Sequence, residues 1–197
     1  MAADLQQQGI HLRPARVEDA TSLAALSIEV WLGTYLRRGV NAFFADYVFA
    51  ELTPSRFETL LQTQSETFIL SQNTDGLDGF IRLSQGKPPP TGLTPTGLTL
   101  PDTGPGSEVE IATLYVQPRH QGRGLGQALL KAGLQLSRDL GAPHPWLTTN
   151  AENTPAIGFY QRMGFQITGR TQFSIQDQSY PNEVLTYRPS QIASQSS

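Results

Sequence analysis

Two periodicities alternate along the chain. Short runs rich in β-branched and aromatic residues, typical of strands, lie at residues 10–13, 67–70, 79–83, 108–116, 145–149, 165–175 and 183–187. Longer runs with apolar residues at helical spacing lie at residues 17–35, 41–50, 54–62, 125–140 and 155–163. Strands interleaved with helices predict one α/β domain, and 197 residues are enough to bury its core.

Local turn chemistry marks several boundaries. Thr53 followed by Pro54 predicts an N-cap and the first helical position, and Thr154 is expected to be the N-cap of a later helix. The Asn-Thr-Asp-Gly sequence of residues 73–76 predicts the turn of a β-hairpin. Residues 177–182 are expected to connect the last two strands as a loop.

Residues 85–107 interrupt this pattern. The segment is dense in proline, glycine and threonine, so it cannot hold a helix and contains few strong strand formers. It predicts a long, mobile insertion that serves either as a spacer or as a lid. Polar residues 1–9 and 189–197 predict flexible ends around a domain of residues 10–188.

Residues 108–140 carry the clearest chemical signal. A strand ends at a proline, and a glycine-rich turn then opens onto a helix. The first N–H groups of a helix have no intrahelical acceptor and lie at the positive end of its dipole. Gly122, Gly124 and Gly126 let an anion approach these groups, and Arg123 adds a charge. We expect a ligand with a pyrophosphate group at this turn.

The spacing of the glycines separates the candidate ligands. A P-loop needs Lys followed by Ser or Thr after its last glycine, whereas Gln127 and Ala128 follow Gly126. A dinucleotide fingerprint has glycines at its first, third and sixth positions, whereas here they fall at the first, third and fifth. A strand-to-helix turn without any ligand is the structural alternative.

The run Gln121-x-x-Gly124-x-Gly126, after a strand that ends Leu-Tyr-Val-x-Pro, resembles the acyl-CoA signature of the GNAT superfamily of N-acyltransferases. Residues 153–165, which begin with Asn and end Phe-Tyr-x-x-Met-Gly-Phe, are similar to that family's second signature. The resemblance covers about residues 108–165. It implies a mixed, mostly antiparallel sheet of six to seven strands with helices on both faces. It also implies an enzyme that transfers an acetyl group from acetyl-CoA to a primary amine.

The same resemblance assigns residues to acetyl-CoA as co-substrate. Backbone groups of Leu114, Tyr115 and Val116 are expected to pair with the pantetheine arm. The side chain of Asn153 is expected to contact the co-substrate. The pyrophosphate is expected at Gln121, Gly122, Arg123, Gly124, Leu125, Gly126 and Gln127.

Two side chains are assigned to the chemistry. Tyr160 matches the family position that often protonates the departing thiolate, and a phenol with a pKa of about 10 is protonated at neutral pH. Alternatively, Tyr160 is a purely structural side chain. Glu110 matches a central-strand position where many members carry a glutamate, and it is the expected base, with Glu108 and Glu152 as alternatives. Because the chain has no cysteine, we expect direct attack in a ternary complex.

The first two predicted helices contain an aromatic-rich block, which consists of Trp31, Tyr35, Phe43, Phe44 and Tyr47. In the family these helices line the acceptor side, so Trp31 and Tyr35 are expected to contact the acceptor. The alternative is that the block is plain core packing. The expected acceptor is a small-molecule or peptide amine. Dimers are common in the family, so a homodimer is among the expected assemblies.

Composition limits the classes of partner and ligand that we expect. The formal net charge of −3 argues against nucleic acid or an anionic membrane as a partner. Three histidines without metal-ligand spacing predict no metal site, and the absence of a membrane-span or secretory-signal pattern predicts a cytoplasmic protein. Two other functions stay open. One is a non-catalytic acyl-CoA-binding domain of the same fold, and the other is a nucleotide-binding enzyme that uses the glycine turn.

Overall fold

The computed structural model of the protein describes residues 9–36, 39–90 and 108–188. Its strands are β1 (His11–Pro14), β2 (Glu66–Gln72), β3 (Leu77–Gln85), β4 (Val109–Val116), β5 (Trp146–Asn150), β6 (Phe165–Ile175) and β7 (Gln178–Tyr187). Its helices are α2 (Ala20–Tyr35), α3 (Ala42–Glu51), α4 (Pro54–Gln62), α5 (Leu125–Asp139) and α6 (Thr154–Arg162), with 3-10 turns η1 (Val17–Asp19) and η2 (Pro118–His120). Every predicted helix is present, and its ends lie within a few residues of the prediction.

The strands pair in the order β1-β2-β3-β4-β5-β7-β6. The pairs β1–β2, β2–β3, β5–β7 and β6–β7 are antiparallel, whereas β4 and β5 pair in parallel with Glu110 opposite Trp146. The predicted mixed, mostly antiparallel sheet is therefore confirmed. The chain forms two compact units: residues 1–85 with 111–136, and residues 86–110 with 137–197. The expected boundaries of a single domain at residues 10–188 stay a prediction.

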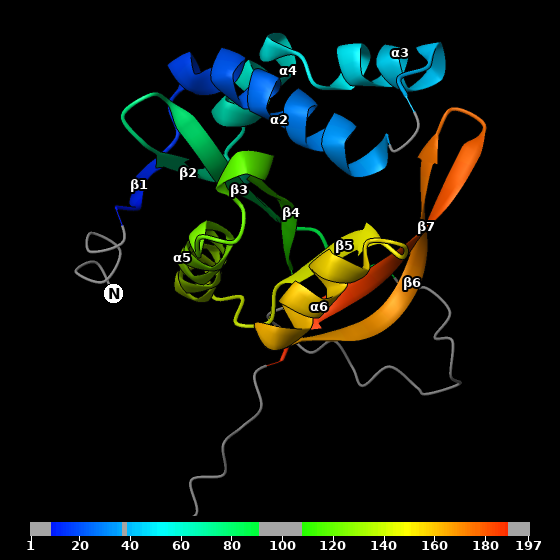
Figure 1. Ribbon diagram of the computed structural model, residues 1–197. Coiled ribbons are helices and arrows are strands. Elements are labelled where there is room, and N and C mark those ends of the chain that lie inside the picture. The colour runs from blue at the N-terminus through cyan, green and yellow to red at the C-terminus, as the bar shows by residue number, and fades with distance from the viewer. Residues whose placement is uncertain (1–8, 37–38, 91–107, 189–197) are drawn as a thin grey trace, which may run out of the picture. The chain divides into compact units, whose positions relative to one another are not determined.

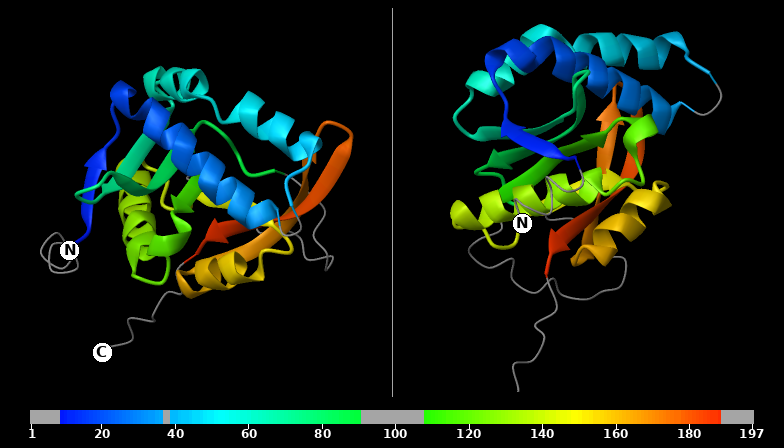
Figure 2. Two further views of the ribbon diagram at one scale, coloured as in Figure 1. Left: turned by 45° about the horizontal axis from the view of Figure 1, so that its top comes forward. Right: turned by 60° about the vertical axis from the view of Figure 1, so that its left-hand side comes forward.

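In the first unit, helices cover both faces of the strands (Figures 1 and 2). On one face, α2 and α4 pack against β3 and β2. The buried side chains of this cluster are Ala20, Leu23, Ala24, Leu26, Val30, Phe57, Phe68, Leu70 and Phe80. Successive side chains of a strand point to opposite faces. Ile81 and Leu83 accordingly face α5, where a Cβ on Gly133 would lie 2.5 Å from Ile81 Cδ1 and 3.3 Å from Leu83 Cδ1.

The close approach of β3, β4 and α5 requires glycine at position 79. A Cβ placed there would lie 2.9 Å from the backbone oxygen of Tyr115 and 3.0 Å from Leu129 Cδ1. We expect Gly79→Ala to lower the free energy of unfolding by about 1–3 kcal/mol, since a backbone oxygen cannot turn away as a side chain can. Urea denaturation measures the change.

Gly158 in α6 provides the matched control for this substitution. Its added Cβ would meet only the flexible guanidinium of Arg162, at 3.3 Å, and alanine favours a helix over glycine by about 0.5–1 kcal/mol. Gly158→Ala is therefore expected to be neutral or stabilising. Equal destabilisation by both substitutions would contradict the steric explanation.

In the second unit, α6 packs against β6. A run of aromatic contacts joins them: the ring of Tyr160 lies 5.7 Å from that of Phe165, which lies 5.2 Å from that of Tyr187. Leu147 of β5 and Leu185 of β7 are buried in the same unit. The ring of Tyr160 is therefore packed against β6.

The expected N-cap of α6 is wrong by one residue. Thr154 is the first helical residue, and the side-chain oxygen of Asn153 accepts the hydrogen bond from the N–H of Ala156, at 3.3 Å. Asn is at least as good a cap as Thr. Pro155 lacks an N–H group, and at the second helical position that group would have no intrahelical acceptor in any case.

The expected loop at residues 177–182 is also wrong. β7 begins at Gln178, and the turn consists of Gln176, with φ of 51°, and Asp177. Pro181 pairs with Gln172 of β6, and its carbonyl accepts from Ala151 on the other side, where the register of β5 ends at residue 150. The nitrogen of Pro181 points to that same side, so its missing N–H removes no hydrogen bond to β6.

The expected insertion begins one residue too early. Gln85 is the last residue of β3, and its N–H donates to the carbonyl of Ser65 at 2.8 Å. Most of the insertion, at residues 91–107, lies outside the described residues, as do nearly all of the expected flexible ends at 1–9 and 189–197. In the part of the chain that is described, no helix is both long enough and apolar enough to cross a membrane.

Candidate functional site

The turn between β4 and α5 has the backbone that its glycines predict. Gly122 and Gly124 have φ of 76° and 82°, in the left-handed region that favours glycine. A Cβ on Gly122 would meet no atom within 4 Å, so the space beside this backbone is open. Gly126 lies inside α5 and has no such requirement.

The first turn of α5 presents backbone donors. Its first intrahelical hydrogen bond runs from the N–H of Ala128 to the carbonyl of Gly124, at 3.0 Å. The N–H groups of Leu125, Gly126 and Gln127 precede this bond and have no intrahelical acceptor. With the positive end of the helix dipole, these groups fit an anion such as a pyrophosphate.

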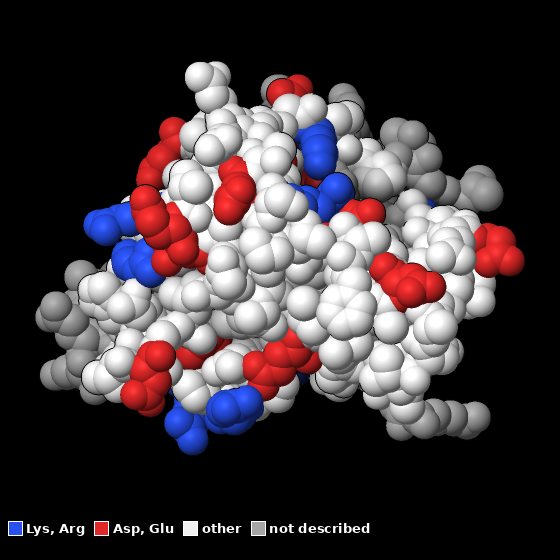
Figure 3. Space-filling view, turned by 90° about the horizontal axis from the view of Figure 1, so that it is seen from above, with Lys and Arg blue, Asp and Glu red and all other residues white. Residues whose placement is uncertain are grey.

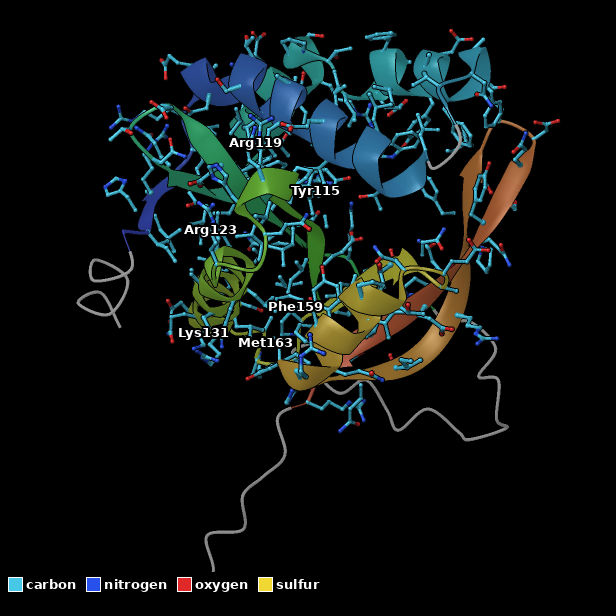
Figure 4. The ribbon with its side chains drawn as sticks, viewed as in Figure 1. Tyr115, Arg119, Arg123, Lys131, Phe159 and Met163 are labelled. Atoms are coloured by element: carbon cyan, nitrogen blue, oxygen red, sulfur yellow. The ribbon has the colours of Figure 1, made fainter. Side chains whose placement is uncertain are left out.

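Gln121 fixes the start of the turn. Its side-chain nitrogen donates to the carbonyl of Val116, at 3.1 Å, and so ties the turn back to the end of β4. The carbonyl of Val116 therefore already accepts a hydrogen bond from the protein. Leu114 and Tyr115 precede Val116 on β4. Arg123 is exposed within the turn (Figure 4). Residues 114–116 and 121–127 thus form one continuous strand, turn and helix within the first unit.

Glu29 of α2 holds the segment that leads into the turn. One of its oxygens accepts from Gln117 Nε2 and the other from the Arg119 guanidinium, each at 2.7 Å. The hydrogen bond from Gln117, followed by that from Arg119, lowers the pKa of Glu29 from its ordinary value. The N–H of Gln117 also donates to the carbonyl of Asp78 in β3, at 2.9 Å. The sequence prediction missed Glu29, although it is the only charged residue of α2.

Charges of both signs lie close together elsewhere on the surface. Arg13 pairs with Asp19 at 2.7 Å and Arg56 with Glu51 at 3.1 Å. On the face seen in Figure 3, acidic and basic side chains lie next to one another.

Acid should weaken the contacts of Glu29. Because the pKa of Glu29 is lowered in the folded protein, its contribution to stability is present above the unfolded pKa and is lost as pH falls through the folded value. We expect Glu29→Gln to reduce stability at pH 7, and the difference from the wild type to shrink below about pH 4. Urea denaturation at both pH values measures it. The exposed Glu58 of α4 is the control, and an equal loss on Glu58→Gln would contradict the assignment.

Glu110 lies in β4 within the second unit. Its side chain is only 18% exposed, and its Oε2 lies 3.7 Å from Nζ of Lys87. Glu108, by comparison, is exposed and offers its backbone carbonyl to Gly86 and Lys87, and Glu152 is exposed in the turn before α6. Partial burial beside a strand backbone suits a base better than full exposure does, so Glu110 stays the preferred candidate.

Asn153 and Tyr160 lie at the two ends of α6, in the same unit as Glu110. The side-chain oxygen of Asn153 caps the helix, so a contact with the co-substrate would have to use its amide nitrogen. Tyr160 is 9% exposed, and its ring contacts Phe159 and Phe165 at 5.2 and 5.7 Å. Packing of the ring holds the phenol in one orientation, as an acid catalyst requires.

The expected acceptor residues lie in α2. Trp31 is 4% exposed, and its ring contacts Phe44 and Tyr47 of α3 at 5.8 and 5.2 Å. This environment fits the core-packing alternative more closely than an acceptor wall. Tyr35 is the last residue of α2, and its side chain lies outside the described part of the protein. The acceptor assignment of both residues stays a prediction.

The model of the acetyltransferase (GNAT) family matches residues 34–165. The chain belongs to this family. Over 76 residues, 38% of this chain, it is 38% identical to the peptidyl-lysine N-acetyltransferase YjaB of Salmonella typhimurium. Over 59 residues, 30% of this chain, it is 41% identical to the streptothricin acetyltransferase of Streptomyces lavendulae. The family model and these relatives are described by name as acetyltransferases.

The matches to curated relatives are short, whereas the structural match is long. The matched stretches span 48% of the YjaB chain and 31% of the streptothricin enzyme. The crystal structure of the PaiA N-acetyltransferase from Thermoplasma acidophilum, in complex with coenzyme A, has a TM-score of 0.65. It is 17% identical, and the alignment covers 88% of this chain and 97% of that one. At this identity the likeness shows that the GNAT protein shares the fold.

Proposed function

We propose that this GNAT protein is an N-acetyltransferase that moves an acetyl group from acetyl-CoA to a primary amine. The observation that carries the proposal is the turn between β4 and α5, with two left-handed glycines and, at the helix start, N–H groups that precede the first intrahelical hydrogen bond. In a chain of this family, such a turn suits the pyrophosphate of CoA. A family neighbour has been solved with coenzyme A bound, which supports acyl-CoA as co-substrate.

The proposed reaction is a direct attack in a ternary complex. An alkylamine has a pKa of about 10.4, so only on the order of one part in 10³ is neutral at pH 7, and a base must remove a proton. Glu110 takes this proton, directly or through water. The amine nitrogen then bonds to the thioester carbonyl carbon, the C–S bond breaks, and Tyr160 gives its proton to the departing thiolate. The second proton of the nitrogen restores the Tyr160 phenol, and Glu110 releases its proton to solvent. Donors near the thioester oxygen and positioning of the amine supply the rest of the rate.

The acceptor is proposed as an amine of a small molecule or a peptide. The named relatives acetylate, by their names, peptidyl lysine and streptothricin. The proposed enzyme is cytoplasmic and uses no metal. Its proposed assembly is a homodimer, which is common in the family. Neither nucleic acid nor a membrane is among the proposed partners.

Thermal unfolding with acetyl-CoA, CoA, ATP and NAD at matched concentrations tests the co-substrate. A ligand at 100 times its dissociation constant stabilises by about 2.7 kcal/mol, which raises Tm by several degrees in a domain of this size. We expect this rise with acetyl-CoA and CoA. A rise with ATP or NAD alone would overturn the proposal in favour of a nucleotide-binding enzyme.

A panel of amines then tests the activity. Release of CoA thiol in the presence of an amine is expected, and the amine that saturates the rate identifies the acceptor class. Stabilisation by acetyl-CoA without thiol release from any small amine or lysine peptide would favour the non-catalytic acyl-CoA-binding alternative.

A further inference from the structure

The chain contains two lysines, Lys87 and Lys131, and one of them lies against the proposed base. Nζ of Lys87 lies 3.7 Å from Oε2 of Glu110. The Glu110 side chain is mostly buried, whereas the Lys87 side chain is 55% exposed. The amine is therefore beside the carboxylate and retains freedom to move.

Two groups, the carbonyl of Glu108 and the indole of Trp146, anchor the backbone around Lys87. Its N–H donates to the carbonyl of Glu108 at 3.3 Å, and the N–H of Gly86 donates to the same oxygen at 2.8 Å. Its carbonyl accepts from Trp146 Nε1 at 2.8 Å, and Trp146 is paired with Glu110 across β4 and β5. The backbone of Lys87 is thus tied to the residue before β4 and to β5, the strand that pairs with β4 at Glu110.

We propose that Lys87 is a self-acetylation site, acetylated in cis by its own chain from acetyl-CoA. The inference rests on the proposed function, and in particular on Glu110 as the base. An acceptor amine has to reach that base in order to lose its proton, and the ε-amine of Lys87 already lies there. Its side chain is exposed enough to turn toward a thioester.

The step balances with the groups already named. The Lys87 ammonium gives a proton to Glu110, and its nitrogen bonds to the thioester carbonyl carbon. The C–S bond breaks, and the CoA thiolate takes a proton from Tyr160. The second proton of the nitrogen restores the Tyr160 phenol, and Glu110 releases its proton to solvent. The products are an Nε-acetyl-lysine and CoA thiol. Acetylation removes the positive charge of Lys87, so this ion pair of Glu110 is lost.

Lys131 supplies an internal control. It lies in α5, in the first unit, with an exposed side chain (Figure 4). Any spontaneous acetylation by acetyl-CoA should act on an exposed lysine. A difference in rate between the two lysines therefore measures catalysis at Lys87 within the same molecule.

The test is a time course of the full-length chain with isotopically labelled acetyl-CoA, followed by peptide mass spectrometry at both lysines. Lys87 is expected to react at least about 100-fold faster than Lys131, the lower end of what general acid–base catalysis supplies. The rate should not depend on protein concentration. Glu110→Gln and Tyr160→Phe should each slow acetylation of Lys87 and leave that of Lys131 unchanged. Should Glu110→Gln fail to fold, Tyr160→Phe alone decides, because it keeps the packed ring.

Each other outcome has a distinct meaning. Equal rates at the two lysines, in a protein that releases thiol with an added amine, would overturn self-acetylation and leave the proposed function intact. A rate at Lys87 that rises with protein concentration would show reaction between chains and overturn the in-cis geometry. No stabilisation by acetyl-CoA, together with unmodified Lys87, would overturn both proposals.

Discussion

Tyr160→Phe is expected to lower kcat by about 10²- to 10⁴-fold, the range that a positioned acid contributes, with little change in the KM for acetyl-CoA. The substitution removes one hydroxyl and keeps the ring in contact with Phe159 and Phe165. Loss of a group that acts only in the transition state reduces kcat and kcat/KM together. Steady-state thiol release with saturating amine measures both constants.

Tyr187 provides the matched control. Its ring contacts Phe165 at 5.2 Å, in the same aromatic run as Tyr160, but it has no proposed role in the chemistry. Tyr187→Phe should leave kcat unchanged within about twofold, as for an ordinary packed phenol. If the two variants have equal kcat values, Tyr160 is a structural side chain and the thiolate is protonated by another group.

Gly124→Val is expected to weaken acetyl-CoA binding by at least about tenfold, or 1.4 kcal/mol. Gly124 has a φ of 82°, and a β-branched residue in this region is strained by roughly 1–2 kcal/mol. The turn can relieve that strain only by moving the backbone that presents the first N–H groups of α5. Titration calorimetry with acetyl-CoA measures the affinity, and the stabilisation of Tm by this ligand should fall with it.

A substitution at Gly141 is the control that distinguishes backbone strain from loss of ligand binding. Its φ of 79° matches that of Gly124, and a Cβ there meets no atom within 4 Å. Gly141→Val should therefore reduce stability by a similar amount, yet retain the affinity for acetyl-CoA. Equal affinities in the two variants would show that the β4–α5 turn does not hold the pyrophosphate.

The turn that carries the proposed function could be predicted because its determinants are local. Left-handed φ at Gly122 and Gly124 follows from glycine in a tight strand-to-helix turn, and the helix after it follows from apolar spacing over residues 125–140. The Asn-Thr-Asp-Gly turn and the Thr53 cap are equally local, and both are present. Signals of this kind act over a few residues and need no partner elsewhere.

Predictions failed where a distant neighbour overrides a local preference. Pro181 and Asn182 are turn formers by themselves, but pairing with β6 extends the strand through them. The packing of Trp31 against Phe44 and Tyr47 of α3 could not be read from the local sequence either, and its expected contact with the acceptor stays a prediction. The local sequence is the same in either arrangement, and only the packed neighbour distinguishes them.

By itself, the sequence of this protein determined its helices, most of its strands and the glycine turn, because hydrophobic period and turn chemistry are short-range properties. The tertiary structure alone decided which charges meet. Glu29 accepts from Gln117, 88 residues later in the chain. Lys87, which follows β3, lies beside Glu110 of β4. An ion pair depends on a separation of a few ångströms between side chains, and separation along the chain carries no information about that distance until the strands and helices have packed.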